Sequence, residues 1–311
     1  MKVLITCPPM LGKIEEFIPI FEEKGIEVIA PKVVQTLSEE ELMELLPKVD
    51  GWIIGDDPAT ERVFAAGKKG KLKAAVKWGV GTDNVDFAAC KKLGIPIANT
   101  PNMFGAEVAG IAVAYVIGLA RQVFLINQKV KEGKWIKPAG ISLAGKTVAL
   151  IGFGDIGKAV ANRLRAFDMK INVYDPYAKK TKCDQKKFSF AVFPEKLQDA
   201  DFVVITCALT KETAHMINDK TIAMMKDGVR VVNVSRGGLI DEEALLRGLK
   251  SGIIHSVALD VFETEPLPQD HELRQFELSI FGTHNGSNTI EGVRRASQKA
   301  VKLLFGFLGI K

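Results

Sequence analysis

The chain of 311 residues has few of the features that mark metal-binding or disulfide-stabilised proteins. It has only four cysteines, far apart and without a CxxC pair, so we expect neither a metal site nor a disulfide framework. Free thiols in a reducing, cytoplasmic environment are the simplest interpretation. The cysteines are Cys7, Cys90, Cys183 and Cys207.

Long apolar segments and a large excess of one charge are also missing. The longest apolar run, at 108–120, has 13 residues and includes two glycines, whereas a membrane-spanning helix needs about 20. The apolar stretch at the N-terminus is too short for a secretory signal. The net charge is only +5, from 42 basic and 37 acidic residues. We therefore expect neither a membrane nor nucleic acid as a partner.

The composition is that of a folded protein, with 47% apolar and 25% charged residues, which excludes a disordered chain, a collagen and a coiled coil. Short β-branched segments alternate with helical patterns, which predicts an α/β fold with parallel sheets covered on both faces. The strands form two series, one near the N-terminus and one between about 99 and 286. We expect them at 2–6, 26–30, 51–55, 74–78 and 95–98, then at 147–151, 170–174, 201–206, 229–234 and 256–260.

Several helices can be placed from apolar spacing and capping residues. An amphipathic helix is predicted at 14–24, and Ser38 starts another because Glu41 follows at capping-box spacing. The apolar run at 108–120 predicts a helix buried inside the protein. Helical spacing also predicts a helix over the last 25 residues.

A glycine motif with the pattern GxGxxG stands between the strand at 147–151 and a helix predicted at 155–167. In a dinucleotide site the first glycine permits a tight turn, the second lets the backbone approach the pyrophosphate, and the third lets helix and strand pack closely. The helix N-terminus offers unpaired N–H groups to the anion. A purely structural turn is the alternative. The expected cofactor-binding residues are Gly152, Gly154, Asp155, Ile156 and Gly157.

Asp175 ends the next strand, 18 residues after Gly157 and close to the expected spacing of about 20. Its carboxylate would accept hydrogen bonds from the adenine ribose and repel a 2′-phosphate, which favours NAD over NADP. A lysine run that follows could bind a phosphate, but a solvated loop is the favoured interpretation. The lysines are Lys179, Lys180, Lys182, Lys186 and Lys187.

Arg236, Glu265 and His284 lie just after later strands or in the loops that follow them. The carboxyl ends of strands in an open parallel sheet face the ligand crevice, so these side chains are expected to converge beside the nicotinamide. Hydrogen-bonded loop residues without a catalytic role are the alternative.

These motifs resemble the NAD-dependent D-2-hydroxyacid dehydrogenase family, and within it the phosphoglycerate dehydrogenases. The resemblance covers nearly the whole chain and is specific for the family but not for one substrate. Besides the glycine motif, it is carried by WGVGTDNVD at 78–86, NTP at 99–101, NVSRGG at 233–238 and ALDVFETEP at 258–266.

The resemblance implies a role for each polar residue. Arg236 binds the carboxylate and oxo group of the substrate through its planar fork of donors. His284 exchanges a proton with the substrate oxygen, and Glu265 orients the imidazole through its other nitrogen. Further substrate-binding residues are implied at Lys77, Gly79, Val80 and Gly81. Asp260 is the implied ligand for the nicotinamide carboxamide, and the other implied NAD contacts are Cys207, Ala208, Val234, Ser235 and Gly286.

The family fold has two doubly wound parallel-sheet domains. A Rossmann NAD-binding domain, here 99–286, is inserted into a flavodoxin-like substrate domain, here 1–98, which is completed by 287–311. Members are typically homodimers. The segment 122–138, which contains Phe124, Trp135 and Ile136, is the expected dimer arm.

The expected reaction is hydride transfer between NAD(H) and a small D-2-hydroxy acid. The first expectation for this acid is 3-phosphoglycerate, whose oxidation is the first step of serine biosynthesis. Hydroxypyruvate, glyoxylate or D-lactate is the alternative, and an NAD-sensing, corepressor-like binding protein is the alternative of another class. Where many members carry Arg-Ser, this chain has Asp56 and Asp57. Two acids near the substrate disfavour a phosphate, unless Lys77 offsets them or they point to solvent.

Overall fold

The computed structural model describes residues 1–179 and 181–310, so Lys180 of the lysine run lies outside it. The chain divides into two compact units, Met1–Phe104 with Asn288–Lys311 (unit 1) and Gly105–Ser287 (unit 2). Unit 1 therefore continues past residue 98, where the sequence analysis ends the substrate domain. The reason is local packing, because the Thr100 hydroxyl accepts the Gly79 N–H at 2.8 Å and the Phe104 ring packs on Trp78.

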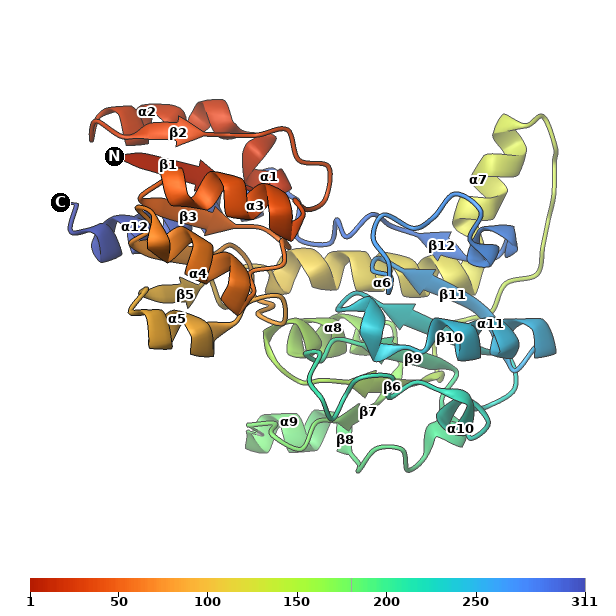
Figure 1. Cartoon of the computed structure of the whole chain (residues 1–311). Coiled ribbons are helices and arrows are strands. Elements are labelled where there is room, and N and C mark those ends of the chain that lie inside the picture. The colour runs from red at the N-terminus through yellow and green to blue at the C-terminus, as the bar shows by residue number, and fades with distance from the viewer. Residues whose placement is uncertain (180, 311) are drawn as a thin grey trace. The chain divides into compact units, whose positions relative to one another are not determined.

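Unit 1 is built on a five-stranded parallel sheet with the strand order β2-β1-β3-β4-β5, the flavodoxin-like order (Figure 1). Every residue of β3 and β4 is buried, as expected at the centre of a sheet that is covered on both faces. The C-terminal helix α12 packs against these two strands and completes the unit. The elements are β1 Lys2–Ile5, α1 Pro8–Leu11, η1 Ile14–Glu16, α2 Ile18–Glu22, β2 Glu27–Ile29, α3 Glu39–Leu45, η2 Leu46–Lys48, β3 Gly51–Ile54, α4 Glu61–Lys69, β4 Ala74–Lys77, α5 Phe87–Leu93, β5 Ile97–Asn99 and α12 Ile290–Leu308.

Unit 2 has a seven-stranded parallel sheet with the order β12-β11-β10-β9-β6-β7-β8 (Figure 1). The chain runs outward from β6 to β8 on one side and continues with β9 to β12 on the other. The order therefore reverses between β6 and β9, which is the switch point where doubly wound sheets bind ligands. The elements are α6 Gly105–Arg121, α7 Val123–Lys131, β6 Thr147–Ile151, α8 Asp155–Arg165, β7 Lys170–Tyr174, α9 Lys182–Lys187, β8 Ser189–Phe190, η3 Leu197–Asp199, β9 Phe202–Ile205, α10 Asp219–Ile222, β10 Val229–Asn233, η4 Gly237–Leu239, α11 Glu242–Ser251, β11 Ile254–Leu259, η5 Glu272–Gln275 and β12 Ile280–Phe281.

The expected α/β class and all ten expected strands are present, with ends shifted by at most two residues. The capping box at Ser38 is confirmed, because the Ser38 hydroxyl accepts the Glu41 N–H and the Glu41 carboxylate accepts the Ser38 N–H. The single helix predicted at 14–24 is wrong. The segment is split into η1 and α2. Pro19 lies in the first turn of α2 and has no N–H, so it cannot donate the backbone hydrogen bond that would continue one helix through this position.

Lys179, Lys182, Lys186 and Lys187 are exposed, as expected, but the last three lie in helix α9 and not in a loop. Thr181 and Asp184 form a capping box that starts α9. This helix is not predicted from the sequence, because a run of lysines is more typical of a solvated loop. The two-residue strands β8 and β12 are not predicted either, because two residues are too few to show the side-chain alternation that marks a strand.

The apolar run at 108–120 lies within α6, whose residues are mostly buried in unit 2. Among the described residues no single helix has both the length and the apolarity to span a membrane. Among the described residues, only α6 and α7 taken together are long and apolar enough, and the two helices are bent by 69° where they meet.

Candidate active site

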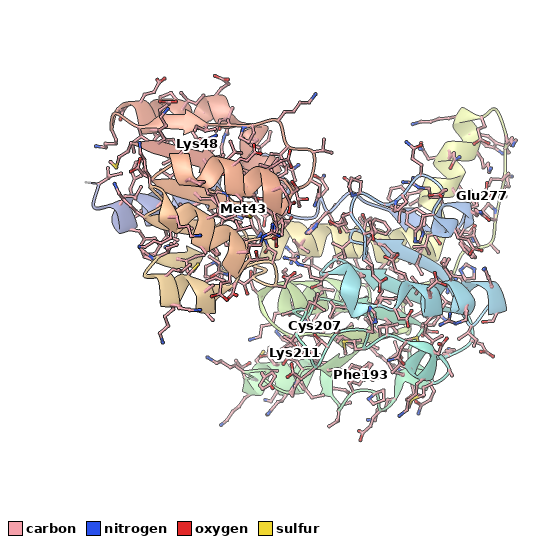
Figure 2. All side chains as sticks on the ribbon, viewed as in Figure 1. Met43, Lys48, Phe193, Cys207, Lys211 and Glu277 are labelled. Atoms are coloured by element: carbon pink, nitrogen blue, oxygen red, sulfur yellow. The ribbon has the colours of Figure 1, made fainter. Side chains whose placement is uncertain are left out.

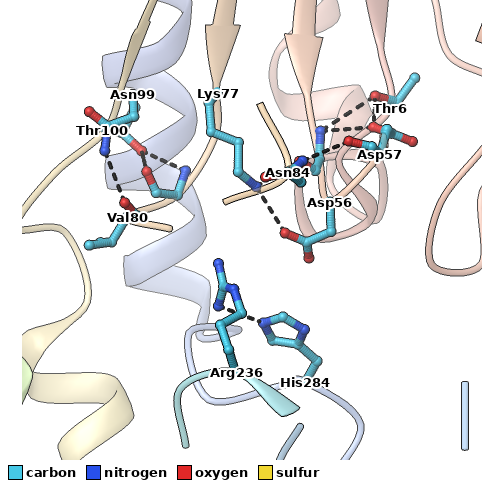
Figure 3. Close-up of polar contacts among 12 residues, drawn as sticks. Thr6, Asp56, Asp57, Lys77, Val80, Asn84, Asn99, Thr100, Arg236 and His284 are labelled. Carbon is cyan, nitrogen blue, oxygen red and sulfur yellow. Dashed lines mark hydrogen bonds and ion pairs between the residues drawn. The ribbon is translucent and has the colours of Figure 1, made fainter. Parts of the chain in front are cut away.

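Three polar side chains predicted from separate motifs come together in unit 2. Arg236 follows β10, Glu265 follows β11 and His284 follows β12, so the parallel sheet delivers all three to one edge. The Nδ1 atom of His284 lies 2.8 Å from Oε2 of Glu265. Its Nε2 atom lies 3.5 Å from a guanidinium nitrogen of Arg236 (Figure 3).

This geometry defines what each group can do. An ionised carboxylate only accepts hydrogen bonds, so the proton between His284 and Glu265 belongs to Nδ1. Nε2 is then the ring nitrogen that can exchange a proton with a ligand, and it stands beside the cation of Arg236. A ligand anion held by Arg236 would thus lie beside the ring nitrogen that can give or take a proton.

The loops that carry these side chains are held by backbone contacts. A Cβ atom on Gly237 would come within 1.9 Å of the Phe262 carbonyl carbon, so the segment after Arg236 passes directly against the one before Glu265. The Glu265 carboxylate accepts the Phe262 N–H at 2.9 Å. The position of Glu265 is therefore set by its own loop as well as by His284.

Glu242, at the start of α11, braces the same segment. Its carboxylate accepts the Glu263 N–H at 2.7 Å, and burial raises the pKa of this carboxyl above its ordinary value. Glu242 is not among the site residues that the sequence predicts. No sequence signal distinguishes it, because its partner is a backbone group that only the fold brings close.

The glycine motif opens α8 as predicted, with Gly154 at the N-cap and no side chain among the described residues capping it. A Cβ on Gly152 would lie 2.6 Å from the Cys207 nitrogen, and one on Gly157 would lie 2.2 Å from the Gly152 carbonyl oxygen. A Cβ on Gly154 would meet no described heavy atom within 4 Å. The first and third glycines thus serve packing, while the second leaves open space in front of unsatisfied helix N–H groups.

That arrangement fits a dinucleotide. Uncapped N–H groups at the start of a helix attract a pyrophosphate, and the absent side chain at Gly154 leaves it room. The predicted contacts at Asp155 and Ile156 lie in the first turn of α8, beside these donors.

Asp175 ends β7 beside the motif, where it holds backbone groups in place. Its two oxygens accept the N–H groups of Phe153 and Tyr177 at 2.7 and 2.8 Å. Its predicted hydrogen bonds to an adenine ribose stay a prediction. A carboxylate anchored in this way presents a fixed negative charge at the end of the strand.

Cys207 and Ser235 lie next to each other at the switch point, since the Ser235 hydroxyl donates to the Cys207 carbonyl. Burial raises the pKa of the Cys207 thiol to about 11, so the thiol stays protonated near neutral pH (Figure 2). This fits a lining residue and not a nucleophile. The contacts predicted at Ala208 and Val234, the chain neighbours of these two, stay predictions.

Asp260 is 3% exposed and makes contacts that the sequence analysis did not anticipate. Its carboxylate accepts the N–H groups of Asn285 and Gly286 and the hydroxyl of Tyr115. About three of its roughly four acceptor positions are therefore occupied by the protein. Its predicted bond to the nicotinamide carboxamide, like the cofactor contact at Gly286, stays a prediction.

The predicted substrate residues of unit 1 cluster after β4. Lys77 is buried, and its ammonium lies 2.6 Å from the Gly55 carbonyl and 2.9 Å from Asp56 (Figure 3). The N–H of Gly79 is taken by Thr100, while Val80 is 41% exposed. Binding by Lys77, Gly79, Val80 and Gly81 stays a prediction.

Asp57 does not lie at a substrate mouth or point to solvent. It is fully buried and accepts the N–H groups of Leu37 and Gly55 and the hydroxyl of Thr6. Burial raises the pKa of this carboxyl. Asp57 is thus a structural residue, and of the two acids only the partly exposed Asp56 is a candidate to influence a ligand.

A hollow of about 410 Å³ lies on unit 1 between α3 and α4 and contains none of the predicted site residues. Its lining includes Met43 (Figure 2), Pro47, Ala65 and Lys69. The site residues are instead grouped by hydrogen bonding at the strand ends.

The comparison with protein families matches residues 113–286 to the model of the D-isomer specific 2-hydroxyacid dehydrogenase, NAD binding domain. A hydroxypyruvate reductase of Thermotoga maritima is 40% identical over 281 residues, which cover 88% of this chain and 90% of that protein. The chloroplastic D-3-phosphoglycerate dehydrogenase 3 of Arabidopsis thaliana is 38% identical over 88% of this chain, but over only 47% of its own length.

Among solved structures, the TT0316 protein from Thermus thermophilus is similar with a TM-score of 0.88 and 29% identity. The match covers 100% of this chain and 98% of that one. The similarity therefore extends over both units and is not confined to the glycine motif.

The glycine geometry predicts different outcomes for two matched substitutions. Gly154→Ala should leave thermal stability unchanged and weaken NADH binding about tenfold or more, because the new methyl enters only the open space. Gly157→Ala should cost about 1–3 kcal/mol of stability, because its methyl would overlap the Gly152 carbonyl. Tm by calorimetry and Kd by fluorescence titration distinguish them, and equal effects on both quantities would contradict this assignment.

His284→Gln should lower kcat for 2-oxo acid reduction by about 100-fold or more, because it removes the proton donor. NADH affinity should change little. His215→Gln is the matched control, since His215 also pairs with a glutamate, Glu263, at 2.7 Å but lies outside the cluster. Comparable kcat values for the two variants would rule out His284 as the acid.

Proposed function

The chain belongs to the D-isomer specific 2-hydroxyacid dehydrogenase family, an NAD-dependent family, and we propose that it reduces a small unphosphorylated 2-oxo acid, hydroxypyruvate first, to the D-2-hydroxy acid. The observation that carries the proposal is the Arg236–His284–Glu265 cluster at the strand ends of unit 2. It combines a carboxylate-binding cation with an oriented proton donor, which is what reduction of a 2-oxo acid requires.

In the proposed reaction Arg236 holds the substrate carboxylate through charge-assisted hydrogen bonds and fixes the oxo group near Nε2 of His284. NADH, when bound, supplies the hydride that adds to C2 of the substrate. His284, with both ring nitrogens protonated, gives its Nε2 proton to the carbonyl oxygen, so that a hydroxyl forms and the neutral Nδ1–H imidazole remains. Glu265 keeps the imidazole in the tautomer and direction that this transfer needs. In the opposite direction His284 takes the hydroxyl proton.

The charge balance around Lys77 supports an unphosphorylated substrate. Its side chain is 2% exposed, and its ammonium is already bound to the carboxylate of Asp56 and the carbonyl of Gly55. A phosphate near these residues would meet an ion pair with no net charge, whose carboxylate, Asp56, is partly exposed. It would therefore have to compete with Asp56 for Lys77.

The relatives named above divide between the two candidate activities. The relative named hydroxypyruvate reductase matches this chain over 90% of its length. The phosphoglycerate dehydrogenase of Arabidopsis matches over about half of its length. Oxidation of 3-phosphoglycerate is the second candidate function, favoured by the name of that relative and by the resemblance of the sequence to the phosphoglycerate dehydrogenases.

The test is a panel of initial rates with NADH and hydroxypyruvate, glyoxylate, pyruvate or 3-phosphohydroxypyruvate. We expect hydroxypyruvate to have the highest kcat/KM. Asp56→Asn should improve the relative kcat/KM for the phosphorylated acid by about tenfold, because it releases Lys77. Glu27→Gln is the control, since Glu27 pairs with Lys2 at the same 2.9 Å but lies outside the predicted site.

Preference of the wild-type protein for the phosphorylated acid would replace the proposal by the second candidate. Binding of NADH with no turnover on any acid, together with NADH-dependent oligomerisation, would favour the corepressor-like binding protein instead.

We also propose that the protein forms a homodimer through the segment 122–138. This segment carries exposed apolar side chains, with Phe124 47%, Val130 46% and Trp135 80% exposed. Apolar side chains gathered on one segment commonly mark an interface, because burying them against a second copy removes them from water.

The combined substitution Phe124→Ser and Trp135→Ser should convert the dimer to a monomer in sedimentation velocity. Val192→Ser, at another exposed apolar position (70% exposed), should leave the dimer intact. A wild-type monomer, or a dimer that survives the double substitution, would exclude this arm.

A further inference from the structure

Tyr115 is a buried polar residue that the proposed reaction does not use. It lies on α6, is 7% exposed, and its hydroxyl donates to Oδ1 of Asp260 at 3.3 Å. Burial and the negative charge of Asp260 both raise the pKa of this hydroxyl, so it remains a donor. The resemblance assigns no role to it, and its position in an apolar run conceals it in the sequence.

Asp260 connects this hydroxyl to the loop of His284. Its main-chain carbonyl accepts the His284 N–H at 2.6 Å. Its carboxylate accepts the Asn285 N–H at 3.2 Å through Oδ1 and the Gly286 N–H at 2.7 Å through Oδ2. One residue thus binds three consecutive backbone donors, beginning at the proton donor of the reaction.

The backbone at His284 needs such support. Its φ of +54° lies in the left-handed region, which residues with a side chain seldom adopt. A backbone in that region persists when its surroundings hold it there. The three bonds from Asp260 supply this restraint, so the direction of the imidazole depends on where the Asp260 carboxylate points.

The space around the Tyr115 hydroxyl indicates that the contact is built into the fold. A Cβ on Gly282 would lie 2.4 Å from the hydroxyl and 2.1 Å from Oδ1 of Asp260. Gly282 precedes the His284 loop by two residues, so the absence of a side chain there lets the tyrosine and the aspartate meet.

We propose that Tyr115 is a positioning residue for catalysis, which acts through the Asp260 carboxylate to hold the His284 loop in its reactive conformation. This proposal adds a residue to the proposed function, and it rests on that function only where its test measures catalysis. Without the hydroxyl, the carboxylate keeps the N–H groups of Asn285 and Gly286 but loses its hydrogen bond to α6, so it can rotate more freely. His284 would then sample positions from which Nε2 misses the substrate oxygen.

The test compares Tyr115→Phe with Tyr174→Phe and the wild-type protein. Both substitutions delete one hydroxyl from a buried ring, because Tyr174 donates to the Glu195 carbonyl at 2.6 Å in the same unit. Tyr174 therefore reports what the loss of a buried hydroxyl does to unit 2 in general. The first readout is amide hydrogen exchange of Asn285 and Gly286 by NMR, which requires no substrate.

We expect these two amides to exchange about tenfold faster in Tyr115→Phe and at the wild-type rate in Tyr174→Phe. With hydroxypyruvate and NADH, kcat of Tyr115→Phe should fall about tenfold while KM and the Kd for NADH stay within about twofold. A merely structural role would lower Tm in both variants without separating kcat from KM.

Unchanged exchange at Asn285 and Gly286 in Tyr115→Phe would overturn the proposal, as would a kcat within twofold of wild type or an equal kcat loss in Tyr174→Phe. If the wild-type protein reduces no 2-oxo acid, the proposed function fails, and the exchange measurement alone decides whether Tyr115 holds the loop.

Discussion

Parallel pairing of the strands in unit 2 is the constraint on which the candidate active site depends. Because β10, β11 and β12 run in one direction, the chain emerges from all three at the same edge of the sheet. Arg236, Glu265 and His284 meet there although up to 48 positions separate them in the sequence. The same pairing places the glycine motif after β6 and Cys207 after β9, on either side of the switch point.

Buried acids hold the loops at these strand ends. Asp260 accepts two backbone N–H groups of the His284 loop, Glu242 accepts one from the segment before Glu265, and Asp57 accepts two in unit 1. The contacts to Leu37, Gly55 and Gly286 satisfy buried donors, each of which would cost about 1–3 kcal/mol if left without an acceptor. Burial raises the pKa of Asp57 and Glu242, and the hydrogen bonds from the loops oppose that effect. These carboxylates therefore serve as fixed acceptors for the backbone.

The glycines and acids of the site illustrate how similar residues take different tasks. Gly152 and Gly157 are required by the protein itself, whereas Gly154 leaves space for a ligand. Asp56 and Asp57 are neighbours in the sequence, yet Asp56 is partly exposed and pairs with the buried Lys77, whereas Asp57 is fully buried. Neither distinction is visible in the residue types.

The sequence by itself determined the α/β class, the position of nearly every strand and the residues of the Arg236–Glu265–His284 cluster. Strand periodicity, turn glycines and caps are local signals, and the motifs depend on residues at short spacing. Only the tertiary structure decided the contacts of Asp57, Glu242 and Tyr115, and the boundary of the first segment of unit 1 after Phe104. These depend on contacts between distant segments, such as Tyr115 with Asp260, 145 positions apart. A hydrogen bond of that kind is determined by which loops the folded sheet brings together, and no local pattern encodes it.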